Sequence, residues 1–139
     1  MSFEVPERYN ASTLLDDNLA AGHGERVAIR TEQEEVTYAD LHDRVCRAAR
    51  ALQALGLQPE QRVLMVMDDT PAWTAVFLGA IRAGAVPVPV SYLDSGANFR
   101  HFIRDSGARI VVAEAPAYEK VLEALAALDR APAVVVRRS

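Results

Sequence analysis

The sequence has 139 residues, 50% of them hydrophobic and 24% charged, which is the balance of an ordinary globular domain able to bury a core. The net charge is −4 and no basic patch interleaves with aromatic residues, so we expect no nucleic-acid binding. No apolar run is as long as a membrane span, the N-terminus has no secretory signal, and the single cysteine excludes an internal disulfide. We therefore expect a cytoplasmic protein with no membrane association.

The first part of the chain predicts a short helix followed by a hairpin. Residues 9–22 read YNASTLLDDNLAAG, with Asn10 or Ser12 as a candidate N-cap and Gly22 as the stop. Two short strands around a polar turn are then expected, at residues 27–30 and 36–38.

A long helix is expected from about Thr37 to Leu55, with Gly56 just past its end. An apolar stripe at helical spacing would face the core, made of Leu41, Val45, Ala48, Leu52 and Leu55. Another face offers two ion pairs in the favourable order, Asp40–Arg44 and Asp43–Arg47. Residues 1–56 thus form an N-terminal section of helix, hairpin and long helix.

Strands and helices alternate over residues 61–137. Strands are expected at 62–67, 85–90, 109–113 and 133–136, and helices in the segments 70–84, 95–107 and 116–128. Such alternation indicates βαβ crossovers, and hence a mostly parallel sheet with helices on both faces. We expect residues 1–139 to form a single α/β unit.

The stretch AVPVPV contains two prolines, Pro87 and Pro89, that lack the N–H a sheet ladder uses. Because residues i and i+2 of a strand direct their N–H groups to the same neighbour, one side of this strand loses its donors. The strand is then either a protected sheet edge, which we favour, or the wall of a crevice where a neighbouring strand diverges.

The helix expected at residues 71–83 is apolar nearly all round its circumference. A helix that covers only one side of a sheet would show a polar face. We therefore expect an exposed apolar patch around Trp73 and Phe77. Its cover would come either from the rest of a longer chain or from self-association through this helix.

Few residues are candidates for chemistry. His23, His42 and His101 have no metal-site spacing, and Cys46 is expected to be a small core residue without a reactive partner. Asp68 and Asp69 follow a strand, where catalytic acids can occur, but a place just before a helix explains them as cap and dipole partners. The only lysine is Lys120.

Several motifs together resemble the adenylate-forming ligases, the superfamily of acyl- and aryl-CoA synthetases. VTYADL at 36–41 is similar to the first core motif of that superfamily, and AIRAGAVPVPV at 80–90 to the second. The segments YNASTLLDDNLAAG and DDTPAWTAVFLGAIRAG resemble the benzoate-CoA ligase branch. The chain departs from that branch after the second motif, where Ser91, Tyr92, Leu93 and Asp94 replace an Asn-Thr-Leu-Leu-like stretch.

The resemblance implies a reaction in which an acid and ATP form an acyl-adenylate, and CoA then displaces AMP. ATP, Mg²⁺ and CoA would serve the full-length parent enzyme, and the family's phosphate loop and catalytic lysine match nothing in these residues. Lys120 matches neither family lysine. We accordingly expect no catalytic, cofactor-binding or metal-binding residue in this chain, which would be an N-terminal ligase fragment, inactive alone. The alternative is a stand-alone, non-catalytic α/β interaction module or a decayed relative.

Overall fold

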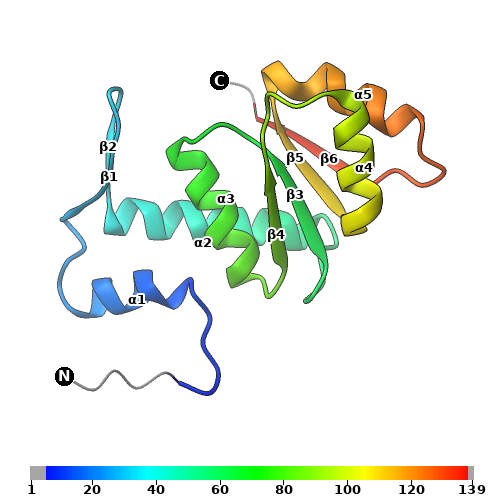
Figure 1. Cartoon of the computed structure of the whole chain (residues 1–139). Coiled ribbons are helices and arrows are strands. Elements are labelled where there is room, and N and C mark those ends of the chain that lie inside the picture. Colours follow the sequence, from blue (N-terminus) through cyan, green and yellow to red (C-terminus); the bar gives the residue numbers. More distant parts are fainter. Residues whose placement is uncertain (1–5, 138–139) are drawn as a thin grey trace.

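The computed structural model describes residues 6–137, and its N-terminal section matches the expected order of elements (Figure 1). This section contains α1 (Thr13–Ala20), β1 (Val27–Arg30), β2 (Glu35–Thr37) and α2 (Tyr38–Ala54). The remainder contains β3 (Arg62–Val66), α3 (Pro71–Arg82), β4 (Val86–Val90), α4 (Gly96–Ser106), β5 (Ile110–Glu114), a short 3₁₀ turn η1 (Ala115–Ala117), α5 (Tyr118–Ala126) and β6 (Ala133–Arg137). No helix of the described residues is long and apolar enough to cross a membrane.

A four-stranded parallel sheet in the order β4-β3-β5-β6 forms the centre, and β1 and β2 pair separately as an antiparallel hairpin. Helices α2 and α3 cover one face of the sheet, and α4 and α5 cover the other (Figure 1). The α/β class with helices on both faces is therefore confirmed.

The two central strands are apolar on both sides, as a sheet covered by two helical layers requires. In β3, Val63 and Met65 pack toward α2 and α3, whereas Leu64 and Val66 pack toward α4 and α5. All four side chains are fully buried. A third cluster joins α1 and the hairpin to α2 and α3, with Leu15 and other fully buried side chains at its centre.

Most helix ends follow the local signals in the sequence. The hydroxyls of Thr37, Thr70 and Ser95 each accept a bond from a backbone N–H one turn into α2, α3 and α4. Gly107 ends α4 in the left-handed conformation, with φ 61°, which glycine adopts without a steric penalty. At α1, Ser12 occupies the N-cap position as expected, but its side chain does not cap the helix. The Ser12 hydroxyl instead donates to the Asn10 side chain, 2.7 Å away.

The buried stripe of α2 differs from the expected one at two positions. Leu41, Val45 and Leu52 are buried, but Ala49 takes the core position expected for Ala48, and Leu55 is 43% exposed. Leu55 lies outside because α2 ends there and the chain reverses at Gly56, which has φ 85°. Leu57, after the turn, enters the core instead.

Only one of the two ion pairs expected on α2 forms. Arg47 meets Asp43 at 3.1 Å. Arg44 instead pairs with Glu34 of the hairpin turn at 2.7 Å, because Asp40 accepts from the Thr37 hydroxyl in the first turn of the helix. A tertiary partner thus replaces the local one.

β4 forms one edge of the sheet, as its prolines predict. It pairs only with β3 among the described strands, with Pro87 opposite Val63 and Pro89 opposite Met65. The Val86 N–H donates to the carbonyl of Gln61, 2.9 Å away, so the valines supply the donors on the paired side. The nitrogens of Pro87 and Pro89 face the open side, where a donor could attract another strand.

Candidate ligand-binding edge of the sheet

The strand order creates a point at which a ligand crevice is expected. The chain leaves β3 through α3 to reach β4 on one side, and it later returns through α4 to β5 on the other side. Because α3 follows β3 on one face and α5 follows β5 on the other, the connections leaving β3 and β5 diverge at the carboxyl edge of the sheet. Ligands of open α/β sheets bind at such a divergence.

Asp68 and Asp69 lie at this edge, directly after β3, and both are exposed. The Asp68 carboxylate accepts from the Asp69 N–H at 2.9 Å, and its backbone carbonyl accepts from the Thr70 N–H at 2.8 Å. Asp68 therefore shapes the turn that leads into α3. Asp69 bonds no described side chain in this arrangement.

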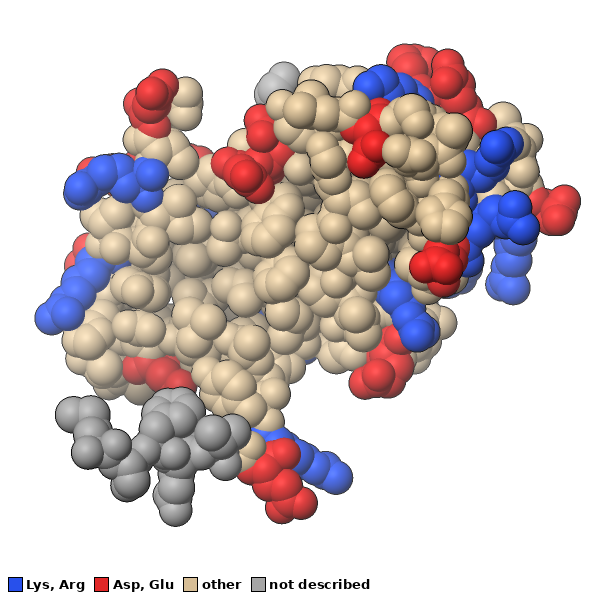
Figure 2. All heavy atoms as spheres, viewed as in Figure 1, with Lys and Arg blue, Asp and Glu red and all other residues tan. Residues whose placement is uncertain are grey.

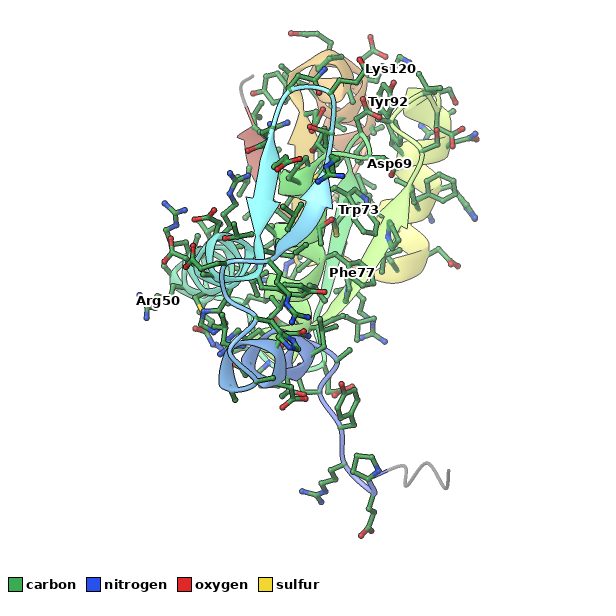
Figure 3. All side chains as sticks on the ribbon, turned by 90° about the vertical axis from the view of Figure 1, so that its left-hand side faces the viewer. Arg50, Asp69, Trp73, Phe77, Tyr92 and Lys120 are labelled. Atoms are coloured by element: carbon green, nitrogen blue, oxygen red, sulfur yellow. The ribbon has the colours of Figure 1, made fainter. Side chains whose placement is uncertain are left out.

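The loop after β4 is held to α5 rather than left open. Lys120 Nζ donates to the backbone carbonyl of Asp94 at 3.0 Å, and the Asp94 carboxylate accepts from the Asn98 side chain at 2.6 Å. Tyr92 packs against the α4–α5 side of the core, whereas Leu93 is 72% exposed. Figure 3 shows Asp69, Tyr92 and Lys120 toward the same end of the sheet, with Trp73 and Phe77 below them.

The next strand ends contribute a charge pair. Glu114 closes β5 and Arg137 closes β6, and their side chains meet at 2.8 Å. The Glu114 side chain is only 12% exposed, so this pair joins two neighbouring strands at the carboxyl edge. The guanidinium of Arg137 is thereby committed to a carboxylate.

Lys120 and Arg137 are two cationic side chains at this edge. Phosphate groups need positioned N–H or cationic donors, but Lys120 and Arg137 are engaged with the protein itself. No group of three or more histidine, cysteine, aspartate or glutamate side chains among residues 6–137 is arranged to hold a metal ion. The described part of the edge consists of the turn before α3, the loop after β4 and the Glu114–Arg137 pair.

His42 of α2 belongs to a polar cluster that was not expected from the sequence. His42 is half-buried, and its Nε2 lies 3.0 Å from a carboxylate oxygen of Asp16 in α1. Arg82 at the end of α3 grips both oxygens of the same carboxylate, at 2.8 and 3.0 Å. This hydrogen bond from Arg82 is the main reason why the pKa of Asp16 falls to about 2. The cluster fastens α1 onto α2 and α3.

Cys46 also differs from expectation, since it is half-buried beside this cluster rather than in the core. Its Sγ lies 3.8 Å from His42 Nε2 and 4.0 Å from Nδ1, so it faces the side of the ring rather than one nitrogen. A nucleophile and its base need one aligned hydrogen bond between them, which these long contacts do not provide. The contacts therefore describe a structural cluster. The i,i+4 spacing of His42 and Cys46 was its only local signal, because Asp16 and Arg82 are distant in sequence.

A family model matches residues 17–138, and its description is "AMP-binding enzyme". The chain belongs to the AMP-binding enzyme family. The match includes the whole sheet and the carboxyl edge described above.

Relatives within the AMP-binding family include aryl-CoA ligases. The chain is 38% identical to a benzoate–CoA ligase of Thauera aromatica, over 80% of this chain and 21% of that protein. It is 35% identical to a 3-hydroxybenzoate–CoA ligase of Aromatoleum sp. strain CIB, over 99% of this chain and 27% of that protein. The crystal structure of a benzoate CoA ligase from Burkholderia xenovorans LB400 has a TM-score of 0.84 and 32% identity, covering 95% of this chain and 26% of that one.

The chain therefore spans about a quarter of the length of these relatives. It corresponds to the N-terminal region of the AMP-binding fold, and both core motifs recognised in the sequence fall within that region.

Proposed function

We propose that this chain is the N-terminal part of an ATP-dependent carboxylic acid–CoA ligase that acts on an aromatic acid such as benzoate. The enzyme would join acid, ATP and CoA to give the aryl-CoA, AMP and pyrophosphate in the cytoplasm. The observation that carries the proposal is the family match over residues 17–138, together with relatives whose names specify benzoate and 3-hydroxybenzoate.

The contribution of these residues to the proposed reaction is structural. The turn at Asp68 and the loop after β4 would form one wall of the ligand cleft, because such clefts open where parallel strands end. The donors that bind the phosphates would come from outside this chain, as would the groups that hold Mg²⁺ and the catalytic lysine. We propose no catalytic residue among residues 1–139.

The apolar side of α3 supports a place within a larger protein. Trp73, Val76 and Phe77 are half-buried, and the rings of Trp73 and Phe77 stack at 4.9 Å. Figure 2 shows few charged atoms in the centre of the face that α3 and β4 occupy, whereas charges surround it. An uncharged area of this kind suits a permanent contact. The occupant we propose is a later segment of the parent ligase.

The test is an assay of the protein translated from the complete reading frame that contains this sequence. Benzoate should support ATP–pyrophosphate exchange and, with CoA, formation of benzoyl-CoA, while a reaction without acid provides the control. Acetate serves as the comparison acid and should give a much lower kcat/KM than benzoate. A reading frame that ends at Ser139, or a full protein that activates no aromatic acid, would contradict the proposal.

A further inference from the structure

A cavity of about 390 Å³ lies at the opposite edge of the sheet, where the parallel strands begin. It opens to solvent and is lined by the start of β3, the end of α4 and the segment that leads into β6. Four arginines line it, namely Arg62, Arg104, Arg109 and Arg130, and no aspartate or glutamate does. The cavity is separate from the carboxyl edge on which the proposed ligase function depends.

The hydrogen-bond ladder between β3 and β5 places two of these arginines side by side. The Arg109 N–H donates to the carbonyl of Arg62 at 2.9 Å, which extends the β3–β5 ladder by one step beyond the strands. Arg62 and Arg109 are therefore neighbours at the amino edge. Arg104 joins them from the last turn of α4, and Arg130 joins them from the loop after α5.

None of the four makes an ion pair with a described residue, although four exposed arginines with this property lie in one cavity. Elsewhere five arginines meet a carboxylate, namely Arg30, Arg44, Arg47, Arg82 and Arg137. Asp105 and Asp129, next to cavity residues in sequence, do not line the cavity. Like charges that share a cavity raise each other's free energy, and a bound anion removes that cost.

Favourable contacts with the protein account for only part of this arrangement. Arg104 lies in the last turn of α4, where the helix dipole stabilises a cation. Arg62 donates one weak bond, at 3.3 Å, to the backbone of Glu60. The strand ladder brings Arg109 beside Arg62, and neither the Arg109 nor the Arg130 guanidinium bonds to a described residue. The remaining guanidinium N–H groups are therefore available to a ligand.

The chemistry of the lining indicates the kind of anion. Guanidinium groups bind phosphate through paired N–H bonds, and several of them around one cavity suit more than one phosphate group. The rest of the lining includes the apolar side chains of Ile103, Leu128 and Pro132. A volume of about 390 Å³ falls in the range of small-molecule sites. We propose that this cavity binds a small ligand that carries two or more phosphate groups.

Calorimetric titration of the 139-residue chain with inorganic pyrophosphate tests the proposal, with sodium acetate at matched ionic strength as the blank. We expect saturable binding to one site, with no saturation by acetate. The double variant Arg104→Gln/Arg130→Gln should weaken pyrophosphate binding about ten-fold or more, since charge-assisted bonds to phosphate are lost. Arg62→Gln/Arg109→Gln provides a second, independent pair with the same expectation.

The matched control is Arg26→Gln/Arg50→Gln, which removes the same net charge from exposed positions away from the cavity. Figure 3 shows Arg50 pointing outward from α2. This control should bind pyrophosphate as the wild type does, and thermal melting checks that every variant folds. Absence of saturable binding, or an equal loss in the control and cavity variants, would overturn the proposal, because the attraction would then be absent or due to net charge alone.

Discussion

Gly79 of α3 lies in close contact with the backbone of α2. A Cβ at this position would meet the Cβ of Ala48 at 2.8 Å and the backbone of Ala49 at 3.1 Å, and neither atom is the flexible end of a side chain. The small size of Gly79 thus sets the distance between the two helices that cover this face of the sheet.

Gly79→Ala should lower the free energy of unfolding by about 1–3 kcal/mol, because overpacking outweighs the better helix propensity of alanine. Urea unfolding of wild type and variant measures the change. Gly24→Ala is the matched control, since its added methyl would make only ordinary contacts, at 3.4 Å or more, and should change stability little. A Gly79→Ala protein as stable as the wild type would show that the helices separate at no cost.

Asp16 is the residue at which stability should depend most clearly on pH. Its pKa is lowered from 3.8 to about 2, first by the hydrogen bond from Arg82, so the folded state favours the ionised carboxylate. The contribution is fully present above about pH 4 and is lost as pH falls toward 2. Because the side chain is 40% exposed, solvent screening limits this contribution to about 1 kcal/mol or less.

Asp16→Asn removes this ionisation while it keeps the shape of the side chain. The variant should be less stable than the wild type at neutral pH, and the difference should shrink as the pH is lowered from about 4 toward 2. Denaturant unfolding over this range, followed by circular dichroism, gives both curves. If the difference in unfolding free energy between wild type and variant stays constant with pH, the charge of Asp16 does not stabilise the packing of α1 on α2 and α3.

At the scale of elements, the role of the two prolines in the edge strand β4 can be tested by substitution. Pro87→Val together with Pro89→Val would restore two N–H groups on the open side of the sheet while preserving the apolar character of the strand. The double variant should self-associate more readily than the wild type, as light scattering at matched concentration would show. Hydrogen exchange that reveals protected amides at both new valines in a fully monomeric protein would contradict an edge role.

Helix α3 offers a built-in probe, because Trp73 is the only tryptophan of the chain. Trp73 is half-buried and stacks on Phe77, so acrylamide should quench its fluorescence less than that of a free tryptophan derivative but still measurably. Phe77→Ala should increase the quenching by removing one face of the cover. Complete shielding of Trp73 in a monomeric protein would argue against an accessible apolar side of α3.

The sequence predicted the elements well where the signals are local. Caps at Thr70 and Ser95, the stop at Gly107 and the proline edge depend on neighbours within a few residues, and the structure confirms them. Local signals could not predict the ion pair of Arg44 with Glu34 or that of Arg82 with Asp16. Both depend on how the hairpin and α1 dock onto α2, which is a tertiary property.

The features of the candidate site also differ in whether local sequence signals predict them. The position of Asp68 and its role in the turn before α3 follow from a strand, an acid and a capped helix in succession. Two other features depend on strand order and could not be predicted from periodicity. They are the contact of Lys120 with the loop after β4 and the cavity that four arginines share. The function class came from motifs rather than from a recognisable set of catalytic side chains.

At the scale of the whole molecule, the fold is distinct from the groups that would make it reactive. The three layers and the carboxyl edge are those of an AMP-binding enzyme, yet Lys120 and Arg137, the cations near that edge, are engaged with the protein. Without free donors around the triphosphate, adenylation gains little acceleration. The isolated chain should therefore have the framework of a ligase without its activity.

ATP–pyrophosphate exchange by the purified 139-residue chain, with Mg²⁺ and benzoate, tests this central claim most directly. We predict no exchange above that of a heat-denatured sample, because Asp68 is used in a turn and Lys120 in a loop contact. Exchange clearly above that level, and abolished by Asp68→Ala or Lys120→Ala, would contradict the account and place a working adenylation site within these residues.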